Sequence, residues 1–280
     1  MAFNKTIQMC IFDSNPNGRI MCELSNWNGR VYKISRSDLF EFGNRPDAEF
    51  TGVYFLFGKD DDNNDTIYIG EAEKMISRLK QHIKDHNYWN DCVVVISKDN
   101  ILNKAHVKYL ENKFYNLAYN AKRSMVINST VPTCSSVSEF DESMLEEFIE
   151  NSKLLVNTLG YKVFEKIDAE LIEKNNGDNT FFIKATRGAD AKGMLIPDGF
   201  LVVSGSKVAI DTTPSMAESL VRIRNKLFEK NIIDENYCFV EDHIFTSPSV
   251  AASVVMGRSA NGRTEWKNKN NKSIKDIEEN

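Results

Sequence analysis

Gly52-Val-Tyr-Phe-Leu-Phe57 and Thr66-Ile-Tyr-Ile-Gly70 are the two apolar runs that decide the fold, and an acidic, polar segment at 59–65 separates them. Both runs are rich in aromatic and β-branched residues, which favour strands, and Gly, Asn and Asp at their borders favour turns. Two such runs joined by a short polar segment predict a β-hairpin. The acidic segment is therefore expected to be its solvated turn.

The residues that follow Gly70 predict a helix, a third strand and a second helix. Apolar residues first recur at the spacing of a helix, at Ile76, Leu79 and Ile83. The run 91–96 then predicts a strand, and residues 104–122 form an amphipathic pattern with a period near 3.6. Strands and helices in this order indicate an α+β fold with a three-stranded antiparallel sheet flanked by helices.

Length and composition permit two modest domains. The chain has 280 residues, of which 41% are hydrophobic, enough for two separate cores. No apolar run approaches the length of a membrane span, and the first residues lack the apolar core of a signal peptide. We therefore expect a cytoplasmic protein with no membrane partner. The five cysteines form no C-x-x-C pair and are expected to be reduced.

Composition also suggests where the domains begin and end. The acidic, polar stretch 165–179 lies between two regions of mixed strand and helix patterns and predicts a boundary. The C-terminal region is expected to be a separate small α+β domain. The predicted division is a β-rich N-terminal leader at 1–48, a core domain at 49–132, an acidic helix and connector at 133–179, a C-terminal domain at 180–268 and a polar tail at 269–280.

The net charge of −5 hides a strong segregation of charge along the chain. Between Lys74 and Arg123 there are ten Lys and Arg against four Asp and Glu, and 257–275 has six basic residues against one acidic residue. Acidic residues concentrate at 59–73 and 139–180. Because phosphate binding normally leaves a basic footprint, the two basic segments are the candidate nucleic-acid contacts.

Several chemically active side chains fall within or beside the first basic segment. Arg78 and His82 are four residues apart, so they project from one face of the predicted helix. Tyr54 and Tyr68 lie on the two strands of the predicted hairpin, each near a glycine. Glu111 interrupts the apolar stripe of the second helix. Together these residues suit a site for a divalent metal and a phosphodiester.

The order and spacing of these residues resemble the GIY-YIG nuclease family. The resemblance covers about residues 50–130 and rests on Gly52-Val53-Tyr54, Tyr68-Ile69-Gly70, Arg78, His82 and Glu111, with Val53 where the family has isoleucine. It implies hydrolysis of a phosphodiester with one divalent cation, Mg²⁺ or Mn²⁺. In that family's arrangement Glu111 would be the sole protein ligand of the metal, and Arg78 would hold the scissile phosphate.

The resemblance leaves two roles open. Tyr54 or His82 could be the general base, with Tyr68 positioning the phosphate, because the ordinary pKa of histidine favours His82 unless that of Tyr54 is depressed. The family also has an asparagine that braces the site. Asn128 is the favoured candidate because a short extended segment precedes it, and Asn116 and Asn120 are alternatives.

The C-terminal region resembles a domain of unknown function found beside such nucleases and restriction-modification proteins. Its recognisable part is a Ser-Pro-Ser run at 247–249, an Asn-Gly pair at 261–262 and Trp266. Arg258, Arg263 and Lys267 surround this tryptophan, so these four residues, together with Lys80 of the first segment, are predicted nucleic-acid contacts. The alternative is a structural domain whose core Trp266 closes.

We therefore expect a metal-dependent endonuclease acting in bacterial DNA repair, restriction or defence, with DNA favoured over RNA as its partner. The alternative is a catalytically silent protein that binds DNA or senses its modification while keeping the nuclease fold. A binding protein would not need Tyr54, Tyr68, Arg78 and Glu111 together, which favours the enzyme.

Overall fold

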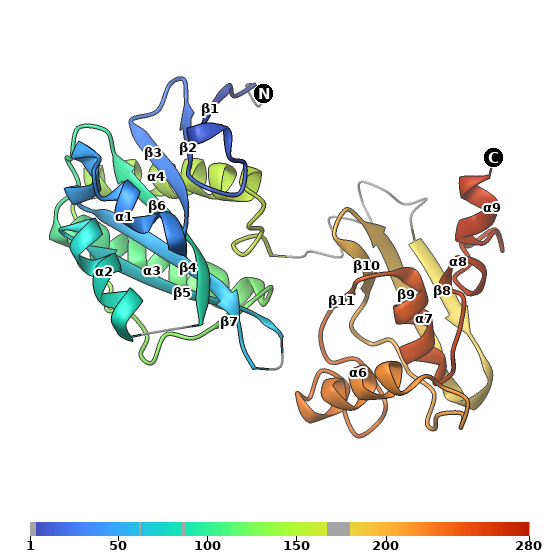
Figure 1. The fold of residues 1–280 in the computed structure, drawn as a ribbon. Coiled ribbons are helices and arrows are strands. Elements are labelled where there is room, and N and C mark those ends of the chain that lie inside the picture. The colour runs from blue at the N-terminus through green and yellow to red at the C-terminus, as the bar shows by residue number, and fades with distance from the viewer. Residues whose placement is uncertain (1–3, 62, 86–87, 167–179, 280) are drawn as a thin grey trace. The chain divides into compact units, whose positions relative to one another are not determined.

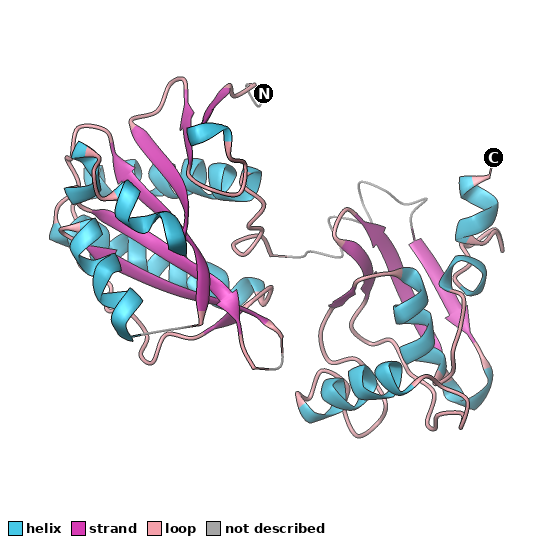
Figure 2. Cartoon of the chain, viewed as in Figure 1, coloured by secondary structure: helices cyan, strands magenta, loops and turns pink. Residues whose placement is uncertain are grey.

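The chain consists of two compact units, Met1–Lys166 and Ile167–Asn280. The computed structural model describes residues 4–61, 63–85, 88–166 and 180–279. Each unit has its own helices and strands (Figure 1) and its own buried hydrophobic residues. Both combine helices with strands (Figure 2), so the predicted α+β class is confirmed. Among the described residues, no helix is long and apolar enough to cross a membrane.

A sheet of seven strands organises the described part of the first unit, in the order β1-β2-β3-β6-β4-β5-β7. Its neighbouring strands are antiparallel, apart from the parallel pair β5–β7. The strands are β1 Ile7–Ile11, β2 Ile20–Leu24, β3 Gly29–Ser35, β4 Gly52–Lys59, β5 Asp65–Ala72, β6 Trp89–Ser97 and β7 Met125–Val126. The predicted hairpin is β4–β5, and β6 is the predicted third strand.

The expected three-stranded sheet is therefore too small. The predicted strands form its β6-β4-β5 part, but β3 pairs with β6 over seven residues and extends the sheet towards the N-terminus. Cys22, Val31 and Ile34 are fully buried in this extension. The predicted leader at 1–48 is therefore part of the first unit's sheet, because its apolar residues complete the cores on both faces.

Helices cover both faces of this sheet (Figure 1). Helices α1 Leu39–Phe42 and α2 Met75–Asp85 lie on one face, and α3 Lys104–Ala121 and α4 Glu139–Thr158 lie on the other. Side chains alternate along β4, so Tyr54 and Leu56 face α2 while Val53 and Phe55 face α3. This alternation puts Tyr54 on the same face of the sheet as Arg78 and His82.

The start of α3 is fixed by its own sequence. The Asn103 side chain accepts hydrogen bonds from the backbone N–H groups of Ala105 and His106, and the His106 ring closes a capping box with the Asn103 backbone. The predicted helix at 104–122 is thus confirmed. Helix α4, capped by Ser138, confirms the predicted acidic helix.

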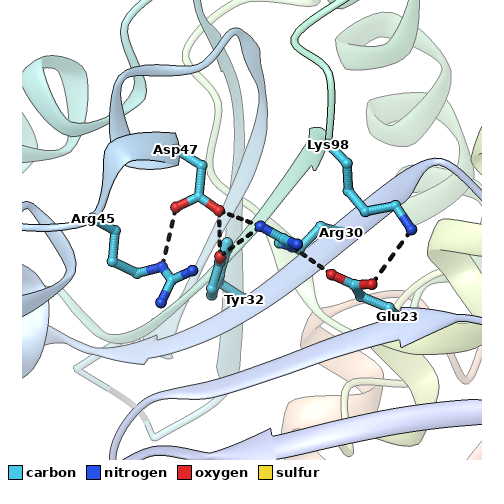
Figure 3. A network of polar contacts seen from close by, with 6 residues as sticks. All are labelled: Glu23, Arg30, Tyr32, Arg45, Asp47 and Lys98. Atoms are coloured by element: carbon cyan, nitrogen blue, oxygen red, sulfur yellow. Dashed lines mark hydrogen bonds and ion pairs between the residues drawn. The ribbon is translucent and has the colours of Figure 1, made fainter.

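A network of ion pairs and hydrogen bonds ties the N-terminal strands to the turn before β4 (Figure 3). Asp47, in the 3₁₀ segment η3 Pro46–Glu49, accepts hydrogen bonds from Tyr32, from Arg30 at 2.6 Å and from Arg45 at 3.0 Å. Glu23 binds the other side of Arg30 and also pairs with Lys98. Segment η3 also contacts α2, so the network supports the helix that carries Arg78.

The second unit has a four-stranded antiparallel sheet among its described residues, in the order β11-β10-β9-β8. Its elements are β8 Thr180–Lys184, β9 Asp190–Ile196, β10 Gly199–Val202, α6 Glu218–Glu229, β11 His243–Phe245, α7 Pro248–Met256, α8 Gly262–Glu265 and α9 Ile274–Glu278. The predicted polar tail at 269–280 therefore contains a helix. Ser273 caps α9 and Ile274 is buried, which fixes this segment to the unit.

Candidate active site

The two tyrosines lie on the paired strands of the hairpin, as predicted, and both are on one face of the sheet. Tyr54 pairs with Gly70 and Tyr68 pairs with Leu56, and the two tyrosine rings are stacked with centroids 6.2 Å apart. Gly70 is required by this arrangement: a Cβ atom there would lie 2.3 Å from both Cζ and the hydroxyl oxygen of Tyr54. The glycine therefore leaves the space that the Tyr54 ring occupies.

Helix α2 brings Arg78 and His82 to the Tyr54 hydroxyl. The Tyr54 oxygen lies 2.7 Å from Nε2 of His82, and Nε of Arg78 donates to it at 3.3 Å. His82 is buried, and the centroid of its ring lies 5.0 Å from that of Tyr68. The four residues predicted from β4, β5 and α2 thus meet in one cluster.

Charge is distributed unequally within this cluster. Burial, aided by Tyr68, raises the pKa of Tyr54 well above its ordinary value. Burial alone would lower the pKa of Arg78, but the oxygens of Tyr54 and Tyr68 raise it on balance. Tyr54 is therefore a neutral phenol beside a permanently charged guanidinium near neutral pH.

Glu111 of α3 reaches the same place from the other face of the sheet. Burial and the neighbouring charge of Glu71 raise the pKa of Glu111 to about 7, although Lys104, the Glu71 backbone and Arg78 oppose the shift. A buried carboxyl group with a raised pKa ionises more readily when a cation lies beside it. Such a carboxyl group is suited to bind a cation.

A surface pocket of about 370 Å³ joins these residues. It lies where β5 ends and α2 and α3 approach, and its lining includes Tyr54, Arg78 and Glu111. His82 and Tyr68 support the Tyr54 side of the pocket through the contacts described above. The lining thus brings the buried Tyr54, the guanidinium of Arg78 and the carboxyl group of Glu111 together around one space.

The lining also includes an ion-paired group that the sequence did not point to, formed by Lys104, Glu71 and Glu73. Lys104 contacts both carboxylate oxygens of Glu71, at 2.8 and 3.1 Å, and lies 3.4 Å from Glu73. Glu71 directly follows the Tyr68-Ile69-Gly70 triplet, and that adjacency was the available signal. Lys104, the first residue of α3, is distant from Glu71 in the sequence, so only the folded structure shows that the two residues pair.

Of the three candidate asparagines, Asn128 has the contacts expected of the residue that braces the site. Its side chain accepts from the Ile69 backbone N–H at 3.0 Å and donates to the Ile69 carbonyl at 2.7 Å. It therefore fixes β5 between Tyr68 and Gly70. Asn116 is exposed and bonds within α3 to Asn112, and Asn120 is exposed, so neither braces the site in this way.

The residues fit a hydrated divalent cation. Among the described residues there is no group of three or more His, Cys, Asp or Glu side chains that could hold a metal ion. A single half-buried carboxylate in a pocket with room for water is nevertheless suited to Mg²⁺ or Mn²⁺, which retain several water ligands. Glu111 is the side chain that would contact such an ion.

Trp266 does not present a surface for base stacking, which corrects that prediction. It is fully buried against Phe200, and its indole N–H donates to the Pro248 carbonyl at 3.0 Å. Gly262 packs so closely on Pro248 that a Cβ atom there would lie 2.1 Å from its carbonyl. The Ser-Pro-Ser, Asn-Gly and Trp motif therefore joins α7 to α8, in line with the structural alternative.

The predicted C-terminal cations are also engaged within their unit. Arg258 pairs with Glu265 at 2.6 Å, and Arg263 pairs with Glu278 of α9. The Lys267 backbone bridges to Phe182, while its side chain is exposed. In the first unit, Lys80 is exposed on α2. The ion pairs weaken the case for a phosphate-binding role of Arg258 and Arg263.

Comparison with known protein families gives a match in the C-terminal region. Residues 181–278 are similar to a family described as Domain of unknown function (DUF4357). The matched range begins where the C-terminal domain was predicted and continues to α9. No curated protein and no solved structure matches the chain.

Proposed function

We propose that the chain is a metal-dependent endonuclease of the GIY-YIG type that hydrolyses DNA phosphodiester bonds in bacterial repair, restriction or defence. One observation carries the proposal: the Tyr54 hydroxyl bonds to both Arg78 and His82, and Tyr54, Arg78 and Glu111 line the same pocket. A hydroxyl linked to a base, a fixed cation and a carboxylate are the groups that phosphodiester hydrolysis requires.

Arg78 would bind the scissile phosphate. Its Nε is committed to Tyr54 and its Nη1 donates to Gln81 at 3.0 Å, so the guanidinium is held in place from two sides. A positioned guanidinium stabilises the charge that accumulates on the phosphoryl oxygens in the transition state. The residue would therefore contribute more to the rate than to the binding of the ground state.

Tyr54 and His82 would together remove the proton from the attacking water. The raised pKa of Tyr54 prevents it from being a free phenolate at neutral pH. It can accept a proton from water only as its own proton passes to Nε2 of His82, 2.7 Å away. The water oxygen then bonds to phosphorus, the opposite P–O bond breaks, and solvent protonates the departing oxygen.

Glu111 would hold the divalent cation. When bound, Mg²⁺ or Mn²⁺ supplies charge that stabilises the phosphoryl oxygens of the transition state. The raised pKa of Glu111 supports this role, because a cation relieves the cost of charging the buried carboxyl group. The other two carboxylates of the lining, Glu71 and Glu73, both pair with Lys104, which favours Glu111 as the ligand of the cation.

The function is tested with the purified full chain and three substrates: supercoiled plasmid, methylated plasmid and RNA. Each is incubated with Mg²⁺, Mn²⁺ or EDTA. We expect nicked or linear plasmid in the presence of metal and intact plasmid in EDTA. Absence of metal-dependent cleavage of all three substrates would overturn the proposal, and cleavage of RNA alone would overturn the assignment of DNA.

Gly70→Ala is expected to lower the cleavage rate about 10²-fold, because the new methyl group would displace the Tyr54 ring. The rate is measured in single turnover at saturating protein. Tyr54→Phe provides the control background. In it, Gly70→Ala should lower the cleavage rate much less, because the hydroxyl that the new methyl group would displace is absent. An equal loss in both backgrounds would show that Gly70 acts through another residue.

A further inference from the structure

We propose that the exposed side of α2 is a docking surface for the phosphate backbone of duplex DNA and guides one strand into the pocket. We name this surface the α2 ridge and define it as Lys74, Ser77, Arg78, Lys80, Gln81 and Lys84. The inference rests on the proposed function, because it assigns a binding surface to the substrate of the same site.

The α2 ridge is separate from the part of α2 that holds the fold together. Met75, Ile76 and Leu79 are buried against the sheet, whereas the ridge residues are exposed. The ridge side chains can therefore bind a ligand without any loss of core packing. From Lys74 to Lys84 the ridge is about 15 Å long, which spans several successive phosphates of one DNA strand.

The cations of the ridge are available for phosphates. Lys74, Lys80 and Lys84 take part in no ion pair within the part of the chain that the structure describes. Three other lysines of the same basic segment are engaged, since Lys98 pairs with Glu23, Lys104 with Glu71 and Lys113 with Glu146. Much of the unpaired positive charge of this segment therefore lies on the α2 ridge.

The ridge continues directly into the candidate active site. Lys74, Ser77, Arg78 and Gln81 belong both to the ridge and to the pocket lining that includes Tyr54 and Glu111. The acidic turn that joins β4 and β5 lies at the opposite end of these strands from Gly52 and Ala72, the end nearest the pocket. Backbone phosphates are thus attracted by the lysines of the ridge and repelled by the acidic turn at the far end of the strands.

The composition of the ridge favours a duplex over a single strand. Proteins that hold unpaired strands stack bases on aromatic side chains, and none of the ridge residues is aromatic. Lysines on one side of a helix contact phosphates without reading bases. The second unit offers a weaker alternative surface, because Arg258 and Arg263 already pair with glutamates.

The test is the salt dependence of DNA binding by the full chain in EDTA, where no cleavage interferes. We expect the double substitution of Lys80 and Lys84 by alanine to reduce the slope of log K against log salt by about 1.8 for a short duplex. The matched control replaces Lys59 and Lys153, which already pair with Asp65 and Glu150, and should leave the slope nearly unchanged. The charge-conserving variant Lys80→Arg/Lys84→Arg should keep the slope of the wild type.

An unchanged slope in the Lys80/Lys84 variant, or an equal change in the control, would overturn the inference. A larger effect on single-stranded DNA or on duplex RNA than on duplex DNA would overturn the assignment of duplex DNA. Because binding is measured without metal, the result is independent of cleavage. A ridge-dependent slope without plasmid cleavage would retain the docking surface and reject the nuclease, and cleavage with an unchanged slope would do the reverse.

Discussion

Glu111→Gln is expected to abolish metal-dependent cleavage and at the same time to stabilise the folded protein above pH 7. The pKa of Glu111 is raised to about 7 by burial and by Glu71, whereas in the unfolded chain it is near its ordinary value. The folded state therefore loses stability as pH rises from about 4.5 to about 7, because the carboxyl group ionises later in the folded state than in the unfolded chain. Glutamine carries no charge and avoids this loss.

The expected gain is about 1–2 kcal/mol at pH 8, with allowance for partial exposure of the carboxyl group, and little at pH 5. Urea unfolding at both pH values, with and without Mn²⁺, measures it. Metal should stabilise the wild-type chain and not the variant. Cleavage should fall about 10³-fold, which corresponds to a loss of about 4 kcal/mol of transition-state stabilisation.

Glu147→Gln is the matched control for this experiment, since Glu147 is exposed on α4. It should leave the stability, its dependence on metal and the cleavage rate close to those of the wild type. Stabilisation of Glu111→Gln by Mn²⁺ as strong as that of the wild type would exclude Glu111 as the metal ligand.

Asp47→Ala is expected to lower the free energy of unfolding by about 3–5 kcal/mol. Asp47 is buried and is the shared acceptor of Tyr32, Arg30 and Arg45, so its removal leaves three donors without that partner (Figure 3). Burial alone would raise the pKa of Asp47, but these donors lower it on balance. Its contribution to stability is therefore present above the ordinary aspartate pKa and is lost as pH falls through the lower folded value.

Urea unfolding at pH 7 measures the effect. Glu49→Ala, in the same 3₁₀ turn but exposed, should change stability by less than about 0.5 kcal/mol. A loss below about 1 kcal/mol for Asp47→Ala would show that the network in Figure 3 does not hold the N-terminal strands to η3.

The sequence predicted well those features that depend on neighbours in the chain. The hairpin β4–β5 follows from two apolar runs and a polar turn, and α3 follows from its periodicity. The meeting of Tyr54, Arg78 and His82 could be predicted because the residues lie on successive elements. The pairing of β3 with β6 could not, since Ile34 and Cys92 are 58 positions apart and nothing local specifies their register.

The basic C-terminal stretch shows a different limit. A tryptophan among arginines suits nucleic-acid binding as well as it suits a core, and only the burial of Trp266 decides between them. The partners of Arg258 and Arg263 lie seven and fifteen residues away, and the second of them is on α9, which the sequence suggested to be a polar tail. A count of charges along the chain cannot show which of them neutralise each other.

The central claim is that the Tyr54 hydroxyl takes part in phosphodiester hydrolysis. It is tested most directly by the single-turnover rate of plasmid cleavage in Mn²⁺ at saturating protein for the wild type, Tyr54→Phe and Tyr109→Phe. Tyr109 is a buried tyrosine whose hydroxyl bonds to Glu142 and Glu146 on α4, and it controls for the loss of a hydroxyl elsewhere in the same unit. We predict a loss of about 10²-fold or more for Tyr54→Phe and little change for Tyr109→Phe. Equal rates for Tyr54→Phe and the wild type would contradict the claim.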